Sequence, residues 1–330
     1  MSFKVISLFT GCGGFDLGFG GDVCVHKKSV TDETPLLRSA TVKDFVNLKR
    51  LPFETVFMND VLPKARDVYL QNFQTDPEKY LLEDIVKLLE TDFVFPDAEV
   101  VIGGFPCQDF SHCGKREGFH SERGSLYKSF VEVVNRVKPK VFVAENVYGL
   151  LTTKGAIETI IDDFSSLGYS VNYQLVDCSK FGVPQKRKRV IIIGTTDVCE
   201  WNLSNPAVAT VGDYLRHVDE PGDDCNDISQ NTYSKTKRQR PQLQGQKCVC
   251  DDGFAPTIRS SHNGNIEFRR HGENERRLTV RECGLLQTFP PDFIFHDEKR
   301  TQTSYKLIGN AVPPLLSYVI AQTVLKLLLR

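Results

Sequence analysis

The sequence predicts an α/β fold with a doubly wound, mostly parallel sheet. Five short apolar runs rich in β-branched residues have the composition of buried strands, and they lie at 5–9, 55–58, 100–103, 141–144 and 190–193. Helical patterns separate these runs, for example at 126–137 and 157–167. Strands that alternate with helices are typical of a parallel sheet covered on both faces. Apolar residues at helical spacing from Leu315 to Leu328 predict a closing helix that returns to this sheet.

The composition is that of a globular protein. The chain has 330 residues, 41 of them Lys or Arg and 42 Asp or Glu, and 40% of its residues are hydrophobic. These values argue against a disordered chain, a collagen-like repeat and an extended coiled coil. A net charge of −1 does not exclude nucleic acid, because a local basic patch can bind it. Ten irregularly spaced cysteines in a long chain argue against a disulfide-stapled secreted fold. With no signal peptide or long apolar run recognised, we expect a cytoplasmic protein without a membrane segment.

Two regions break the alternation of strands and helices. Residues 26–52 are polar and charged, and we interpret them as an insertion between the first two strands. Residues from about 200 to 272 are poor in apolar periodicity and rich in Asp, Asn, Gly, Ser and Gln, which indicates a smaller domain. We therefore predict a main domain at 1–197, a smaller domain at 198–304 and a C-terminal segment at 305–330 that returns to the main domain.

A glycine-rich turn follows the first predicted strand, and an acidic residue follows the second. The segment Phe9-Thr-Gly-Cys-Gly-Gly14 lets the backbone approach a ligand closely, and Asp60 is placed where a carboxylate can hold ribose hydroxyls. The dinucleotide pattern G-x-G-x-x-G fails, because its last position is Asp16. A nucleoside without a pyrophosphate therefore fits better than a dinucleotide. The alternative is a tight turn without a ligand.

A candidate nucleophile follows the third predicted strand, in Gly103-Gly-Phe-Pro-Cys-Gln-Asp-Phe-Ser111. A thiolate nucleophile needs access and a lowered pKa, which a polar loop can supply to Cys107. The alternative is a buried, inert cysteine.

Charged residues accompany the last two predicted strands. Glu145 ends an apolar run, where a carboxylate is costly unless it is paired or functional. Gln185, Arg187 and Arg189 alternate along an extended segment and would point the same way. Arginines at the edge of a site suit a phosphate or a base carbonyl. The alternatives are a helix cap or structural salt bridge for Glu145 and a solvated basic edge for the arginines.

In this order, the four blocks resemble those of the DNA cytosine-5 methyltransferases, especially the bacterial restriction–modification type. Four further blocks match: Glu83-Asp84-Ile85, Arg123-Gly-Ser-Leu126, Arg276-Arg-Leu-Thr-Val-Arg-Glu282 and Gly309-Asn-Ala-Val312. The resemblance covers almost the whole chain. It implies a Rossmann-like fold that binds S-adenosylmethionine, a smaller target-recognition domain, and double-stranded DNA as substrate.

The resemblance also implies residue roles. Asp60 would hold the ribose and Asp84 the adenine amino group. Cys107 would be the nucleophile, and Glu145, Arg187 and Arg189 would hold the target cytosine. The residues expected to line the S-adenosylmethionine pocket are Phe9, Gly11, Gly14, Asp60, Asp84, Ile85, Pro106 and Asn310.

DNA contacts are expected in a polar loop at 108–124 and in the smaller domain. The residues that we assign to DNA are Gln108, Ser111, Arg238, Arg240, Thr257 and Arg259. A second basic group comprises Arg269, Arg270, Arg276 and Arg277, which we also expect to contact DNA. Cys248-Val-Cys250 lacks the usual spacing of a structural zinc site, so we expect no metal.

Three other functions compete with DNA methylation. A tRNA cytosine methyltransferase of the same fold would carry a Cys-Phe-Thr tripeptide, which the sequence lacks. A catalytically silent DNA-binding module would have lost its nucleophile or acid. A nucleotide-dependent oxidoreductase is disfavoured by the failed glycine pattern. We expect a monomer, with a restriction endonuclease of the same site specificity as a partner that need not touch it.

Overall fold

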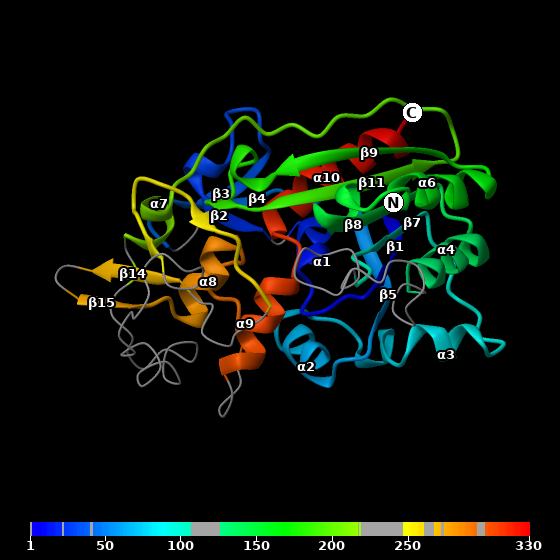
Figure 1. Ribbon diagram of the computed structural model, residues 1–330, viewed down its shortest axis with the longest axis horizontal. Coiled ribbons are helices and arrows are strands. Elements are labelled where there is room, and N and C mark those ends of the chain that lie inside the picture. The colour runs from blue at the N-terminus through cyan, green and yellow to red at the C-terminus, as the bar shows by residue number, and fades with distance from the viewer. Residues whose placement is uncertain are drawn as a thin grey trace.

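The computed structural model describes residues 2–21, 23–39, 42–106, 126–216, 218, 247–260, 267–271, 274–295 and 301–330. Its main body is a seven-stranded sheet with the order β6-β5-β1-β7-β8-β11-β9 (Figure 1). These strands are β1 (Phe3–Leu8), β5 (Phe53–Asp60), β6 (Tyr80–Leu82), β7 (Val100–Gly103), β8 (Val141–Val147), β9 (Ser170–Asp177) and β11 (Lys188–Thr195). The five strands expected from the apolar runs are all present in it.

The sheet is mostly parallel, as predicted. β1 pairs in parallel with β5 on one side and with β7 on the other, and only β11 runs antiparallel to its neighbours β8 and β9. The strand order therefore reverses between β1 and β7. In open α/β sheets, ligands bind beyond the carboxyl ends of the strands at such a reversal.

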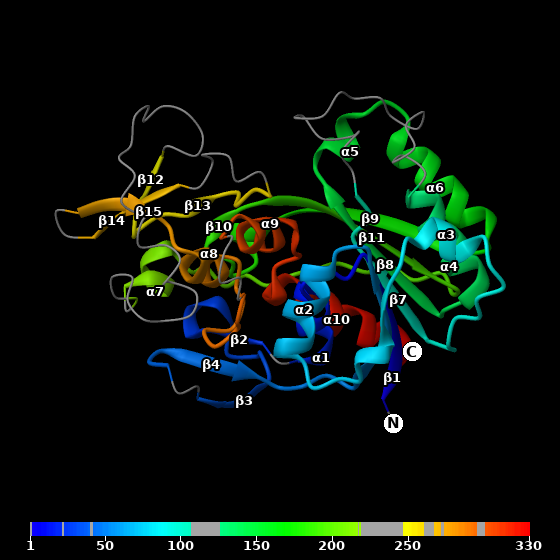
Figure 2. The same ribbon diagram turned by 90° about the horizontal axis from the view of Figure 1, so that it is seen from below.

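Helices cover both faces of the sheet because successive strand residues point to opposite sides. Val100 and Ile102 join the apolar cluster of α1 (Gly14–Gly20) and α10 (Pro314–Leu328), whereas Val101 joins that of α4 (Leu126–Val137) and α6 (Ala156–Ser166). Figure 2 shows α1, α2 (Pro63–Asn72) and α10 on one side and α3 (Ile85–Leu89), α4 and α6 on the other. The predicted closing helix is thus confirmed.

A smaller group of elements lies beside the main sheet in Figures 1 and 2. It contains α7 (Val211–Leu215), β12 (Cys248–Val249), β14 (Phe268–His271), β15 (Asn274–Arg277) and α8 (Val280–Leu286). The two-stranded pair of β10 (Gln185–Lys186) and β13 (Ala255–Pro256) joins this group to the segment that leads into β11. α9 (Thr301–Asn310) follows. The domain boundaries at 197 and 304 stay predictions.

The segment that we interpret as an insertion has structure of its own. β2 (Cys24–His26), β3 (Leu36–Ser39) and β4 (Phe45–Leu48) form an antiparallel three-stranded sheet. Its Phe45 ring packs edge-on against Tyr214 of α7 at 5.5 Å, and Lys28 pairs with Asp213 at 2.7 Å. The insertion therefore supports the first helix of the smaller group.

One described segment, Gln302–Leu328, has the length and hydropathy of a membrane span, and 67% of its most apolar window is buried. It comprises α9 and α10, which are separate helices. Burial of α10 against α1 is what the core helix of a globular protein also shows.

Candidate active site

The turn after β1 has an unusual backbone. Phe9 and Gly11 have φ angles of 53° and 57°, in the left-handed region. Such a conformation is strained for phenylalanine, and strain of this kind is concentrated at functional sites. A Cβ atom on Gly11 would meet nothing within 4 Å, so the turn presents an open face at the carboxyl end of β1.

Asp60 ends β5 and is bound to this turn. Its Oδ2 accepts a hydrogen bond from the Gly11 N–H at 2.8 Å, and its Oδ1 accepts one from the Leu62 N–H at 2.9 Å. Burial raises the pKa of Asp60 above its ordinary value, and these backbone donors oppose that effect. The carboxylate is therefore held in place beside the glycine turn.

Asp84 is brought to the same edge through Asn59. The Asn59 side chain donates to the carbonyls of Leu81 and Glu83, at 3.1 and 2.9 Å, and so fixes the loop before Asp84. Asp84 caps α3, its Oδ1 accepting from the Val86 N–H at 2.9 Å. The following Ile85 is only 2% exposed and packs in the core.

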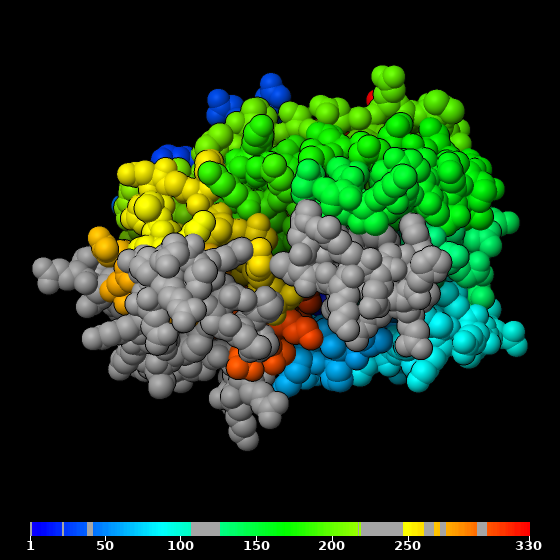
Figure 3. Space-filling view, in the orientation of Figure 1, coloured from blue at the N-terminus to red at the C-terminus, as the bar shows by residue number. Residues whose placement is uncertain are grey.

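Asn310 lies at the end of α9, close to the glycine turn. A Cβ atom on Gly14 would lie 2.5 Å from the Val312 carbonyl oxygen and 3.0 Å from the Ala311 Cβ, so the segment after Asn310 packs tightly there. Figures 2 and 3 show α9 beside α2, the helix that follows Asp60. The predicted cofactor residues thus converge from β1, β5, α3 and α9.

Sequence analysis missed two residues at this edge. Val61 directly follows Asp60, and 56% of its surface is exposed. Burial raises the pKa of Asp60, and the positive charge of Lys306, which is exposed on α9, partly opposes that rise. The spacing of four residues between Lys306 and Asn310 places both on one helix face, and this spacing could have indicated Lys306 from the sequence.

Glu145 and Arg189 form a buried ion pair on neighbouring strands. Their residues are 7% and 9% exposed, and Arg189 Nε lies 2.6 Å from Glu145 Oε1. Among the described residues, no group other than Arg189 pairs with this buried oxygen. Arg189 Nη1 also donates to the carbonyl of Lys188 at 2.8 Å.

The segment that leads to Cys107 lies against Glu145. A Cβ atom on Gly104 would be 3.2 Å from Glu145 Oε2, and the Asn146 side chain donates to the Phe105 carbonyl at 3.3 Å. Pro106 is exposed. Cys107, Gln108 and Ser111 lie outside the described residues, as do Arg238 and Arg240.

We expected Arg187 to contact the target base, but its guanidinium is buried and bound to the protein backbone. It is 1% exposed, and its guanidinium donates to three backbone carbonyls. These carbonyls belong to Ile258 at 3.1 Å, Gly309 at 2.9 Å and Ala311 at 3.1 Å. Arg187 therefore binds the smaller group of elements to the end of α9.

Thr257 and Arg259 flank the residue that Arg187 holds. The Thr257 hydroxyl donates to the Lys186 carbonyl at 2.7 Å. A Cβ atom on Gly309 would lie 2.3 Å from the backbone of Arg259, so α9 ends in close contact with that backbone. Both predicted DNA-binding residues are thus placed beside the segment of Arg187 and Arg189.

The sequence led us to expect DNA contacts from Arg269, Arg270, Arg276 and Arg277, and for three of these four arginines that expectation is wrong. Arg269 and Arg276 are buried, and they pair with the fully buried Glu282 at 2.6 and 2.9 Å. Arg277 is 4% exposed and stacks on the Phe268 ring at 4.6 Å. Burial and pairing make these three arginines part of the core of the smaller group, and Arg270 is the one with a side chain that is 67% exposed.

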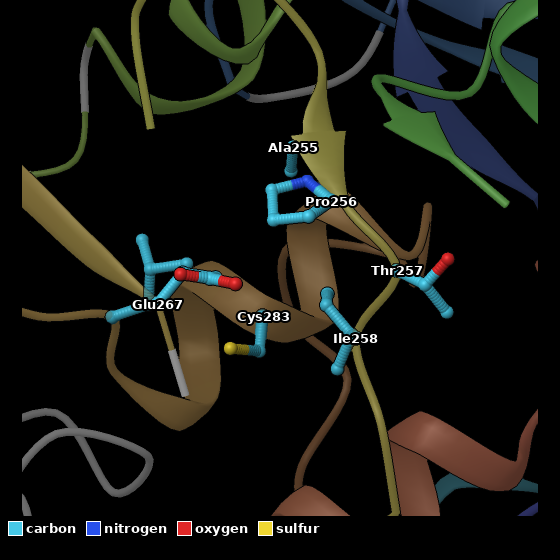
Figure 4. Close-up of a pocket in the computed structure, with 7 residues that line it drawn as sticks. Ala255, Pro256, Thr257, Ile258, Glu267 and Cys283 are labelled. Carbon is cyan, nitrogen blue, oxygen red and sulfur yellow. The ribbon is translucent and has the colours of Figure 1, made fainter. Parts of the chain in front are cut away.

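A cavity of about 10 Å³ lies within the smaller group (Figure 4), and neither Asp60 nor Glu145 lines it. Its volume suits about one water molecule, so it cannot hold a nucleoside. The residues around it are Ala255, Pro256, Thr257, Ile258, Glu267, Leu278 and Cys283. Over the described residues, no group of three His, Cys, Asp or Glu side chains is arranged to hold a metal ion.

Comparison with known proteins places the chain in a family. The model of the C-5 cytosine-specific DNA methylases matches residues 3–242 and 210–326. The type II methyltransferase M.BspRI of Lysinibacillus sphaericus is 34% identical over 98% of this chain and 81% of its own length. M.NgoFVII of Neisseria gonorrhoeae, another type II methyltransferase, is 33% identical over 98% of this chain and 86% of its own.

Solved structures share the fold. The Dnmt2 methyltransferase of S. pombe superposes with a TM-score of 0.70 at 18% identity, covering 98% of this chain and 99% of its own. The Entamoeba histolytica methyltransferase EhMeth also gives a TM-score of 0.70, at 14% identity over 99% of this chain and 98% of its own. The family model and the type II relatives show that the chain belongs to the C-5 cytosine-specific DNA methylase family and is a DNA cytosine-5 methyltransferase.

Proposed function

We propose that the protein transfers a methyl group from S-adenosylmethionine to carbon 5 of a flipped-out cytosine within a specific sequence of duplex DNA. The observation that carries this proposal is the buried pair of Glu145 and Arg189, which lies against the backbone leading to Cys107. A paired carboxylate and guanidinium can recognise the polar edge of a pyrimidine once the base has left the stack.

The residues at the carboxyl ends of β1 and β5 fit the proposed cofactor. Each oxygen of Asp60 accepts one backbone N–H and keeps a second lone pair for a ribose hydroxyl. Asp84 uses Oδ1 to cap α3, which leaves Oδ2 for the adenine amino group. The open face of Gly11 admits the ligand, and the exposed Val61 suits an apolar ring face. When bound, S-adenosylmethionine supplies the sulfonium methyl group.

Five other residues complete the proposed cofactor site by position. Phe9 and Gly14 bound the turn, Asn310 approaches it from α9, and Pro106 follows β7 across the reversal in strand order. Ile85 supports the loop of Asp84 from within the core.

In the proposed reaction, the Cys107 thiolate adds to carbon 6 of the cytosine. The electron pair displaced from the carbon 5–carbon 6 double bond would then form the bond from carbon 5 to the methyl carbon, as the bond from that carbon to the sulfonium sulfur breaks and the thioether S-adenosylhomocysteine leaves. Glu145 shares a proton with ring N3, and Arg189 stabilises the developing charge at the carbonyl oxygen. A base then takes the proton from carbon 5, and the bond between sulfur and carbon 6 breaks to release the thiolate. Arg187 acts as a positioning residue, because backbone carbonyls occupy its guanidinium.

Duplex DNA would lie along the edge formed by Thr257 and Arg259. Gln108, Ser111, Arg238 and Arg240 are proposed DNA contacts that come from the sequence alone. Bacterial type II methyltransferases among the relatives support a restriction–modification role, with an endonuclease of the same specificity that need not contact this protein. We propose a monomer that acts in the cytosol.

The test is methyl transfer by the purified protein from labelled S-adenosylmethionine to a mixed-sequence duplex, mapped by bisulfite sequencing. We expect 5-methylcytosine in one short motif, and none with Cys107→Ser. Transfer to tRNA instead of duplex DNA would replace the proposal with the tRNA alternative. Tight DNA binding without transfer to either substrate would favour a silent module.

A further inference from the structure

An exposed lysine and a tyrosine lie next to the buried pair of Glu145 and Arg189. Lys188 begins β11 and is exposed, whereas Arg187 and Arg189 on either side of it are buried. Tyr148 directly follows β8, and 38% of its surface is exposed. The Lys188 ammonium lies 5.6 Å from the centre of the Tyr148 ring, within the range of a cation–π interaction.

The backbone places this pair at the ligand edge of the sheet. β8 and β11 are antiparallel, with Arg189 opposite Val147, so the residues one step beyond are Lys188 and Tyr148. β8 also runs parallel to β7, and the carboxyl ends of both strands therefore lie at this edge. The Arg189 guanidinium donates to the Lys188 carbonyl at 2.8 Å, which fixes the backbone under the lysine.

The chemistry of the pair suits a ligand with a diffuse negative charge. An aromatic ring restrains an ammonium group without neutralising it, whereas a carboxylate would cancel its charge. Restraint also reduces the rotamer entropy that a free lysine loses on binding. Asp177, the neighbour of Lys188 on β9, accepts hydrogen bonds from the Ser179 N–H and hydroxyl, and no carboxylate among the described residues forms an ion pair with Lys188. The pair therefore presents a restrained positive charge at the same strand ends as the residues proposed to hold the cytosine.

We propose that Lys188, held by Tyr148, binds a backbone phosphate of the target strand next to the flipped cytosine. This inference rests on the proposed function. Phosphate contacts set the position of a protein on a duplex without reading its sequence. A phosphate fixed beside the flipped nucleotide would hold the strand while its base rotates out toward Glu145 and Arg189. The lysine would thus help to position the protein on the duplex and to rotate the base out of the stack, and it would not contribute to recognition of the DNA sequence.

The salt dependence of binding tests this contact. Binding of the full-length protein to a fluorescent mixed-sequence duplex is measured over a tenfold range of KCl concentration. Losing one phosphate contact lowers the log–log slope by about 0.9, so the affinity advantage of the wild type over Lys188→Gln shrinks about eightfold across that range. Lys188→Arg keeps the slope, and Lys188→Glu lowers it further.

Two further variants separate charge from placement. Tyr148→Leu keeps the charge, so we expect an unchanged slope with affinity about two- to fivefold weaker. Lys326 is a matched control, because it is exposed on α10 near the C-terminus, and Figure 2 shows that end of the chain at the opposite edge of the sheet. Lys326→Gln should bind like the wild type.

Equal slopes for the wild type, Lys188→Gln and Lys326→Gln would overturn the inference. Methyl transfer by the wild type to the same duplex is measured in parallel. If the wild type methylates the duplex and the slopes are equal, the inference alone fails. If the wild type neither binds nor methylates the duplex, the proposed function fails with it. Thermal melting confirms that each variant is folded.

Discussion

The side-chain amides of Gln185 and Gln287 form a buried hydrogen bond, from Nε2 of Gln185 to Oε1 of Gln287 at 2.7 Å. The other end of each amide is also used. Gln185 Oε1 accepts from the Ile258 N–H at 3.0 Å, and Gln287 Nε2 donates to the Ala311 carbonyl at 2.7 Å. The network therefore joins the Thr257 segment to the Asn310 segment through two glutamines.

Gln185→Ala should weaken both ligand sites and the fold. Removing this amide leaves buried partners without hydrogen bonds, which costs about 1–3 kcal/mol of the free energy of unfolding. Urea denaturation measures that loss, and titrations measure the weaker binding of S-adenosylmethionine and of duplex DNA. Gln71→Ala, at an exposed position of α2, is the control and should change neither. A loss confined to stability would mean that the network does not couple the two sites.

Glu145→Gln should slow methyl transfer by about 10²- to 10³-fold, because an amide cannot share a proton with ring N3 as a carboxylate does. Single-turnover assays with saturating cofactor and duplex isolate this step. Binding of S-adenosylmethionine should be unchanged, since Asp60 and Asp84 remain. A variant with the wild-type rate would remove Glu145 from the proposed mechanism.

Gly104→Ala should reduce the transfer rate by about tenfold while leaving the protein folded. The added Cβ would lie 3.2 Å from Glu145 Oε2, so the carboxylate must move by a few tenths of an ångström. Displacements on the scale of 1 Å can cost about 100-fold in rate, and this one is smaller. Gly253→Ala is the matched control, because its Cβ meets only a carbonyl oxygen at an ordinary 3.6 Å. Equal rates for the two variants would contradict the prediction.

Asp16 should make stability depend on pH in a direction opposite to most carboxylates. Burial raises the pKa of Asp16 to about 6, although hydrogen bonds from Ser7, Thr55 and Tyr69 oppose the shift. The folded state then holds a proton that the unfolded state releases near pH 4. The free energy of unfolding therefore falls as pH rises from about 4 to about 6, by about 3 kcal/mol for a shift of roughly two units.

Asp16→Asn removes this dependence, so it should stabilise the protein above pH 6 and have little effect near pH 4. Urea denaturation of both proteins at the two pH values measures the difference. Asp67→Asn, at a side chain on α2 that is 59% exposed, controls for the loss of one charge. A destabilised Asp16→Asn protein at pH 7 would show that the hydrogen bonds outweigh burial.

The central strands could be predicted because buried parallel strands are continuous β-branched runs. β9 could not, since it is an edge strand with Tyr173 and Leu175 exposed, and it lacks such a run. Asp60 was indicated by its place after a predicted strand, and Asp84 by the resemblance to the family alone. The structure brings both acids to one edge, through an Asn59 side chain whose partners only the fold reveals.

The contacts of the buried arginines could not be predicted from the sequence. Arg187 and Arg189 alternate as predicted, yet one binds carbonyls and the other a carboxylate. The carbonyls that Arg187 binds are 71, 122 and 124 residues away, so local pattern carries no trace of them. Likewise, the sequence alone does not distinguish arginines that pair with the buried Glu282, such as Arg269 and Arg276, from arginines that are exposed to water.

The contact between α1 and α10 links two helices that are far apart in the sequence. A Cβ atom on Gly18 would lie 2.3 Å from the Ser317 side chain, and the Ser317 hydroxyl donates to the Phe15 carbonyl at 2.5 Å. The helix that opens at the glycine turn therefore completes its packing only when a segment 302 residues further along the chain has been made. At about 5–20 residues per second, a nascent chain waits tens of seconds for that partner. We expect the growing polypeptide to remain inactive until α10 has been synthesised, so that no partly made enzyme modifies DNA.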